Sequence, residues 1–144
     1  MPKRSSSGAR QKAAPSCQTE PLLGSQKFMA FVATCDPVRA RAFYRDTLGL
    51  HLLSEDQFAL AFDVAGTMLG VTSVQKVAVA NYTVLGWQVP DIVQTAKNFQ
   101  EARVNVERYP GMQQDELGIW KSPSGAKVVW FKDPDGNTLS ITQF

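Results

Sequence analysis

Residues 131–144, FKDPDGNTLSITQF, end the chain, and residues 61–74, AFDVAGTMLGVTSV, match them at an offset of 70 positions. An Asp, a Gly, a Leu and a Thr stand at the same places in the two stretches. Runs rich in β-branched and apolar residues on both sides of a Gly-containing turn are typical of a β-hairpin. The match therefore predicts a duplicated unit, each copy of which ends in a hairpin.

A second repeat, at an offset of 55 positions, supports the duplication. It places Met29 on Val84 and Asp36 on Asp91, and an apolar run precedes the Asp in both copies. An Asp at such a place can accept hydrogen bonds from the free backbone N–H groups of a following helix. Each half is thus expected to contain, in this order, a strand, a capped helix and up to three further strands.

The expected elements follow the same order in both halves. In the first half they are a strand at 27–35, a helix at 36–50, a short strand at 51–56 and a hairpin at 58–74. In the second half they are a strand at 81–89, a helix at 92–102, a strand at 104–109 and a hairpin at 127–143. The connection at 109–125 is long, and it is either a lid over a site or a second hairpin that turns at 123–125.

Length and charge divide the chain into a tail at 1–25 and one domain at 26–144. The tail is rich in Ser, Ala, Arg, Gln and Pro and carries a net charge of about +3, so it is expected to be disordered. The domain carries about −1 and offers no basic surface to a phosphate backbone. We therefore expect no binding of nucleic acid by the domain.

The sequence gives no sign of a membrane or a disulfide framework. No apolar run approaches the roughly 18 residues of a membrane span, and the N-terminus lacks the apolar region of a secretory signal. Cys17 and Cys35 have no CxxC spacing. A soluble cytoplasmic protein without membrane association is expected.

Two motifs resemble the vicinal oxygen chelate superfamily, which includes glyoxalase I, extradiol dioxygenases, fosfomycin-modifying transferases and bleomycin resistance proteins. DPVRARAFYRDTLGL at 36–50 is similar to the family's first-helix pattern, and WFKDPDGNTLSITQ at 130–143 to its final hairpin. The resemblance covers about residues 27–144. It implies an α+β fold of tandem βαβββ modules, at about 27–75 and 81–144, that form a cup-shaped mixed sheet, commonly in a homodimer.

The resemblance also implies where a metal ion would be held. In metal-dependent members the ligands, usually His and Glu, come from the first and last strands of each module, and these positions fall on Met29, Gly70, Val84 and Ser140. Zinc, manganese and iron(II) require imidazole, carboxylate or thiolate ligands, which none of the four provides. The lone His51 lies beyond the first helix and is expected to be a half-exposed strand residue. We expect no metal and no other cofactor.

Strand alternation from these four positions predicts the lining of a ligand cavity. The predicted lining is apolar and aromatic with a few hydroxyl groups, and it consists of Met29, Phe31, Met68, Gly70, Thr72, Tyr82, Val84, Gly86, Thr138, Ser140 and Thr142. Such a lining suits a neutral or aromatic small molecule.

Other candidates for chemistry have simpler structural explanations. Cys35 precedes a helix, but a small buried thiol is the favoured interpretation. Asp63 and Asp133 stand at expected turns, and Tyr82 is either a proton donor or a polar wall of the cavity. Trp87 alternates onto the helix-facing side of its strand, whereas Trp120 and Trp130 are undecided between cavity wall and core.

The favoured function is a metal-independent binding protein, similar to the bleomycin-binding branch, that sequesters or carries a small organic molecule. A neutral lining does not suit cationic bleomycin itself. The alternative is an enzyme of the same fold, a lyase, isomerase or dioxygenase type, that uses acid–base chemistry without a metal or an unrecognised metal site. No catalytic residue can be named, although Tyr82, Ser140 or an acid of the long loop could handle a proton.

Overall fold

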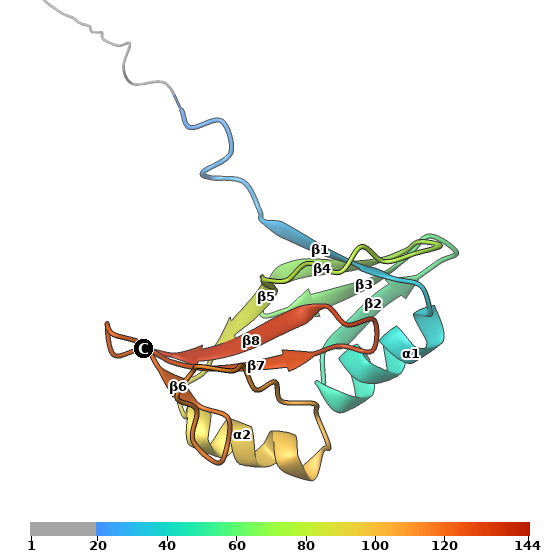
Figure 1. The fold of residues 1–144 in the computed structure, drawn as a ribbon. Coiled ribbons are helices and arrows are strands. Elements are labelled where there is room, and N and C mark those ends of the chain that lie inside the picture. The colour runs from blue at the N-terminus through green and yellow to red at the C-terminus, as the bar shows by residue number, and fades with distance from the viewer. Residues whose placement is uncertain (1–19) are drawn as a thin grey trace, which may run out of the picture.

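The computed structural model describes residues 20–144, which form two four-stranded mixed sheets with one helix against each (Figure 1). The first half contains β1 (Met29–Thr34), α1 (Pro37–Arg41), a π-helical turn (Ala42–Thr47), β2 (His51–Glu55), β3 (Ala59–Val64) and β4 (Thr67–Ser73). The second half contains β5 (Thr83–Gln88), α2 (Ile92–Glu101), β6 (Trp120–Lys121), β7 (Lys127–Lys132) and β8 (Thr138–Gln143). The expected tandem βαβββ fold is confirmed.

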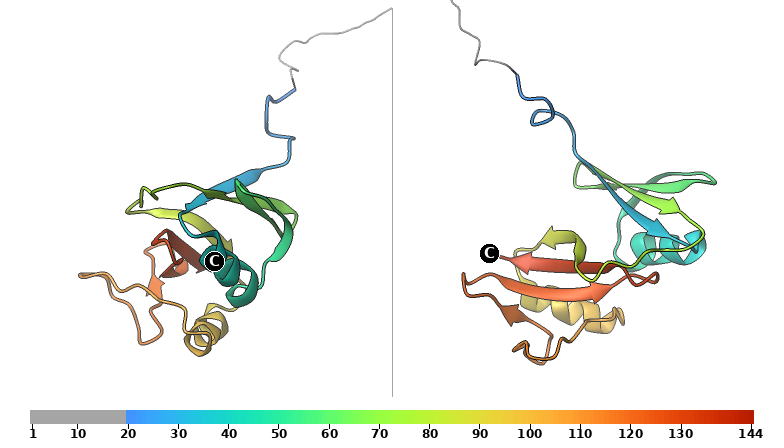
Figure 2. Two further views of the ribbon diagram at one scale, coloured as in Figure 1. Left: turned by 90° about the vertical axis from the view of Figure 1, so that its right-hand side faces the viewer. Right: turned by 45° about the horizontal axis from the view of Figure 1, so that its top comes forward.

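Both sheets have the same strand order, β1-β4-β3-β2 and β5-β8-β7-β6. In each sheet the first and last strands of the half run parallel, and the remaining pairs are antiparallel. Figure 2 shows each helix lying against one face of its own sheet. The opposite faces of the two sheets, called the open faces below, carry no helix.

The first helix begins as the sequence predicts, and its last turn is π-helical. The side chain of Asp36 accepts a hydrogen bond from the backbone N–H of Arg39 at 3.2 Å, and Pro37 occupies the first helical position. After Arg41 the helix widens into a π-helical turn, in which the N–H of Leu48 donates to the carbonyl of Phe43 at 2.9 Å. Gly49 follows at φ +79° and stops the helix.

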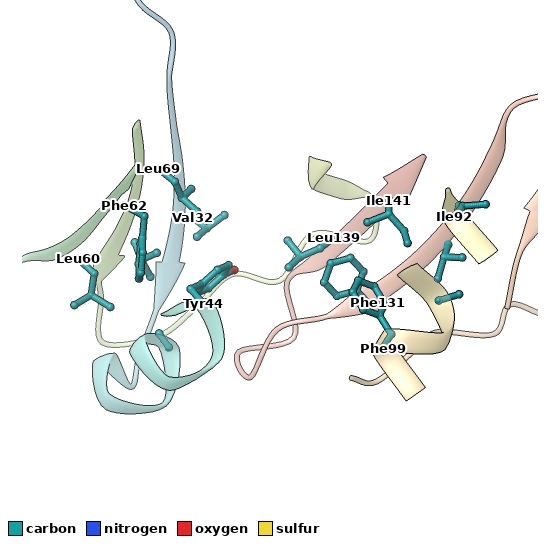
Figure 3. Packing of buried hydrophobic residues seen from close by; sticks show 14 of the residues in the cluster. Val32, Tyr44, Leu60, Phe62, Leu69, Ile92, Phe99, Phe131, Leu139 and Ile141 are labelled. Carbon is teal, nitrogen blue, oxygen red and sulfur yellow. The ribbon is translucent and has the colours of Figure 1, made fainter. Parts of the chain in front are cut away.

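Apolar side chains on the helix-facing sides of the two sheets form the core (Figure 3). In the first half the cluster includes Leu60, Phe62 and Leu69, and in the second half it includes Phe99 and Phe131. Trp87 packs against Phe131 with ring centroids 6.2 Å apart, which confirms that this tryptophan faces α2. Alternation along each strand thus decides which residues build the core and which remain on the open face.

The turn between β7 and β8 joins the second half to the first. The buried hydroxyl of Tyr44 donates to Asp133 Oδ2 at 2.7 Å, and the side-chain amide of Asn137 donates to the carbonyl of Ala33 at 3.0 Å. Asp133 also accepts hydrogen bonds from the backbone N–H groups of Asp135 and Asn137 within its own turn. The DPDGN sequence therefore shapes a turn and also fastens the two halves together.

Two expectations are corrected, and one alternative that the sequence left open is decided. Residues 104–109 do not form a strand, because only Val106 makes a β-bridge, to Phe131. The connection at 109–125 ends in a hairpin, since β6 pairs with β7 across a turn in which the N–H of Gly125 donates to the carbonyl of Ser122. Asp63 lies within β3 opposite His51, not at a turn, because Ala65 and Gly66 supply the two left-handed corners of that hairpin. The tail expected at 1–25 falls largely outside the described residues.

Candidate functional site

A hollow of about 820 Å³ lies between the two halves, bordered by β1 and β4 on one side and β5 on the other. Its lining is mainly apolar and includes Phe28, Met29, Phe31, Val84 and Gly86. No hydrogen-bonded ladder joins β1 to β5 in the described part of the chain, so each presents one unpaired edge to this region. The hollow is open to solvent and large enough for a small organic molecule.

The strand register shows which of the predicted lining residues share an open face. In the first sheet Met29 lies opposite Met68 and Phe31 opposite Gly70, in parallel register. In the second sheet Gly86 lies opposite Ser140 and Thr83 opposite Thr138. A bulge between Thr83 and Leu85 accommodates Val84. The two halves place equivalent pairs at equivalent positions, as the offsets of 55 and 70 predict.

The space over Gly70 is filled by an aromatic ring of the same chain. A Cβ atom added at Gly70 would lie 2.8 Å from Phe31 Cδ1, closer than real contacts allow. Phe31 is 60% exposed and lines the hollow, so its ring both lies over Gly70 and keeps solvent-exposed surface. We expected Gly70 to leave free volume for a ligand; the structure assigns that volume to Phe31 instead.

Ser140 holds the corresponding place in the second sheet. Its residue surface is only 7% exposed, and its hydroxyl group makes no hydrogen bond to any other described residue. The Oγ atom would lie 2.9 Å from a Cβ added at Gly86, so it points toward β5 and occupies the space that a side chain at that position would need. A buried hydroxyl without a partner is unusual in a folded protein and has the capacity to bind a ligand atom.

The remaining predicted lining residues lie on or beside the two sheets but do not border the hollow. Thr72 lies on the open face toward the end of β4, and Met68 lies near the start of that strand. In the same way, Thr142 lies toward the end of β8 and Thr138 at its start. Thr138 is buried and accepts a hydrogen bond from Lys132 Nζ at 2.9 Å. Tyr82 precedes β5 and is 67% exposed. Of the eleven predicted residues, the hollow itself is lined by Met29, Phe31, Val84 and Gly86.

The sequence left Trp120 and Trp130 undecided between cavity wall and core, and it did not place Tyr109. Trp130 lies directly opposite Ser140, and Trp120 and Tyr109 pack against Trp130 with ring centroids 5.6 Å and 5.5 Å away. Alternation of β7 from Phe131, a helix-facing position, would have placed Trp130 on the open face. Tyr109 and Trp120 could not have been placed this way, because they belong to an irregular connection and a two-residue strand.

The side chains at the four metal-equivalent positions do not fit the ion that the fold family implies. Met29, Gly70, Val84 and Ser140 supply one thioether, one hydroxyl and no imidazole or carboxylate, a donor set that hard and borderline divalent ions do not select. Among residues 20–144, no group of three or more His, Cys, Asp or Glu side chains comes together. His51 lies exposed in β2, opposite Asp63.

Cys35 differs from the expectation of a buried thiol. It is exposed at the end of β1, and both its backbone N–H and its thiol donate to Asp135 Oδ1, at 2.9 Å and 3.2 Å. The hydrogen bond from the thiol to Asp135 is the main cause that raises the pKa of Cys35. The thiol is therefore held in its protonated, less nucleophilic form.

Comparison with known proteins gives a family and a fold. The family model described as the Glyoxalase/Bleomycin resistance protein/Dioxygenase superfamily matches residues 27–141. None of the curated proteins matches this sequence. Within the described residues, no helix is long and apolar enough to cross a membrane.

Several solved structures share the fold at low sequence identity. A lactoylglutathione lyase from Agrobacterium tumefaciens is 19% identical, with a TM-score of 0.65 over 83% of this chain and 93% of that one. A putative glyoxalase family protein from Bacillus anthracis is 16% identical, with a TM-score of 0.66 over 88% of this chain and 98% of that one. Oxidase ChaP-H2 is 20% identical, with a TM-score of 0.64 over 85% and 95% of the two chains.

Proposed function

The chain belongs to the glyoxalase/bleomycin resistance protein/dioxygenase superfamily, and we propose that it is a member that binds a small organic molecule without a metal ion. In this proposal it sequesters or carries a neutral or aromatic compound. One observation carries the proposal: the hollow of about 820 Å³ is lined mainly by apolar groups and includes two of the four metal-equivalent positions, Met29 and Val84, neither of which offers a ligand for a divalent ion.

The composition of the hollow favours binding by burial of apolar surface. Met29 and Phe31, which project from the edge strand β1, are 48% and 60% exposed. Covering apolar surface contributes about 25 cal/mol per Å², so one aromatic ligand that covers these side chains would gain several kcal/mol. Exposed apolar side chains gathered in a concavity are typical of a binding site.

We further propose that the protein acts as a homodimer. The edges of β1 and β5 that border the hollow are unpaired in the described chain, and Phe28, Phe31 and Tyr82 expose more than half of their surfaces near them. Unpaired edges next to exposed aromatic residues favour association. A second copy would cover both edges and complete the walls of the hollow.

Two measurements on the purified protein test the metal-free part of this function. Elemental analysis is expected to find no stoichiometric zinc, iron, manganese or nickel. Native mass spectrometry is expected to detect a bound organic compound, retained or added from a library of aromatic compounds, whose binding does not change after treatment with a chelator. About one metal ion per chain, or binding that a chelator abolishes, would contradict the proposal.

A further inference from the structure

The open face of the second sheet brings aromatic and hydrogen-bonding side chains together in two adjacent rows. The register of β7 against β8 sets Trp130 opposite Ser140 and, two residues along, Lys132 opposite Thr138. Gly86 of β5 lies opposite Ser140 on its other side, so the first row consists of Trp130, Ser140 and Gly86. These pairs lie on the same face because alternate residues of a strand project to the same side.

Three aromatic rings form one wall of this face. Trp120 tilts against Trp130 at 38° with centroids 5.6 Å apart, and Tyr109 meets Trp130 edge-on at 81° and 5.5 Å. All three side chains are half-buried, so they retain exposed ring surface. Flat aromatic surface of this kind binds planar rings by stacking.

The polar groups beside this wall are hydrogen-bond donors. Lys132 Nζ donates to Thr138 Oγ1 at 2.9 Å and has no carboxylate within ion-pair distance among the described residues, so two of its three N–H groups remain free. Ser140 is buried, and its hydroxyl has no hydrogen-bond partner among residues 20–144. Burial, and to a lesser degree the Glu107 carboxylate, raises the pKa of Tyr109, so its phenol keeps its proton.

We infer that this face binds a planar aromatic compound bearing a carboxylate or phenolate oxygen, with the ring against Trp130 and the oxygen toward Lys132. The wall supplies stacking surface, and Lys132 supplies charge-assisted hydrogen bonds that only an acceptor can use.

This inference rests on the proposed binding function and narrows its ligand from a neutral or aromatic compound to an aromatic anion. Gly86 connects the two regions, since it lines the hollow and also lies opposite Ser140. A ligand in the hollow can therefore extend over the open face of β8, across Ser140, to Trp130.

The test compares two probes that share one ring system and differ in charge, 2-naphthoate and 2-naphthylmethylammonium. Titration of the full-length protein, followed by calorimetry, is expected to give a Kd for 2-naphthoate about tenfold lower than for the ammonium probe. Lys132→Met should remove this preference by weakening 2-naphthoate alone. Trp130→Leu should weaken both probes by about tenfold or more, because stacking does not depend on the charge of the probe.

Lys127→Met is the matched control, because Lys127 lies on the same strand five residues away and projects to the opposite face. It should leave both Kd values unchanged, and circular dichroism should report folded protein for all three variants. Equal affinity for the two probes, or an equal loss in Lys127→Met and Lys132→Met, would overturn the inference and leave the binding function standing. Binding of neither probe would overturn the inference, and the native mass spectrum then decides separately whether the protein binds any small molecule.

Discussion

The Tyr44 hydroxyl donates a 2.7 Å hydrogen bond to Asp133 Oδ2, and this bond links the two halves of the protein across 89 positions of sequence. Tyr44 is fully buried and Asp133 is 5% exposed, so water cannot replace either partner. The π-helical turn at Ala42–Thr47 carries Tyr44 into this position.

Tyr44→Phe is expected to lower the free energy of unfolding by about 2 kcal/mol, because a buried carboxylate loses a donor. Chemical denaturation measures the change. Tyr82→Phe is the control, since its hydroxyl belongs to an exposed side chain, and a change within about 0.5 kcal/mol is expected there. Equal effects of the two substitutions would show that the bond to Asp133 contributes no stability.

The stability of the protein should fall at alkaline pH through the same tyrosine. Burial, followed by the nearby Asp133 carboxylate, raises the pKa of Tyr44 above its ordinary value of 10.0. Below pH 10 the residue is neutral in both states; above it the unfolded chain loses this proton while the folded protein keeps it. The free energy of unfolding should therefore decrease by up to about 1.4 kcal/mol per pH unit above pH 10.

Denaturation of the parent protein and of Tyr44→Phe between pH 8 and about pH 11 separates this contribution from that of the other tyrosines. The variant should lose part of the alkaline slope, because phenylalanine has no proton to release. An unchanged slope in the variant would assign the alkaline instability to other groups.

Gly70 and Leu69 are neighbours on β4 that face opposite sides of the first sheet. Leu69 is 2% exposed in the core, and Gly70 lies beneath the Phe31 ring at the open face. Leu69→Trp should destabilise the protein by about 3 kcal/mol through overpacking. Gly70→Trp should displace the Phe31 ring into open space, with a smaller loss of stability and a loss of aromatic-probe binding in the hollow.

Thermal melting and probe titration of these two variants check the register of β4. The opposite result, with stability lost in Gly70→Trp and retained in Leu69→Trp, would mean that the strand is shifted by one residue. Phe31→Ala supplies the companion measurement, since Gly70→Ala should be tolerated better in that background than alone.

Cys35 should react slowly with alkylating reagents although it is exposed. Its thiol donates to Asp135 Oδ1 at 3.2 Å, and this bond raises the pKa of the thiol. In a Cys17→Ser background, the rate of iodoacetamide modification near pH 8 should be lower than that of a free cysteine model compound. Asp135→Asn should raise the rate, since it removes the acceptor charge. A rate that Asp135→Asn leaves unchanged would exclude control by this carboxylate.

The dimer proposal predicts twice the chain mass by light scattering at micromolar concentration. Replacing the exposed Phe31 with Lys should shift the protein toward the monomer, because a charge would have to be buried at the proposed interface. Lys76→Glu changes an exposed residue of the connection before β5 and should leave the protein dimeric. Removal of the first 25 residues is also expected to leave the protein dimeric. A monomer mass for the parent protein would refute the dimer.

The sequence by itself determined the duplicated order of elements and the two faces of each sheet. The offsets of 70 and 55 positions predicted that Phe31 and Gly70 would be equivalent to Gly86 and Ser140, and the two sheets pair them in the same way. This succeeds because strand alternation, helix caps such as Asp36 and turns such as 133–136 depend on residues close in the chain.

Only the tertiary structure decided which groups these side chains contact. The ring of Phe31 over Gly70, the bond from Tyr44 to Asp133 and the exposure of Cys35 each depend on how separate segments pack. The same holds for the wall of Trp120, Trp130 and Tyr109, which joins residues of two strands and an irregular connection. Local sequence specifies the direction in which a side chain projects; only the packing of distant segments specifies the group that it contacts, because that contact is made after the chain has folded back on itself.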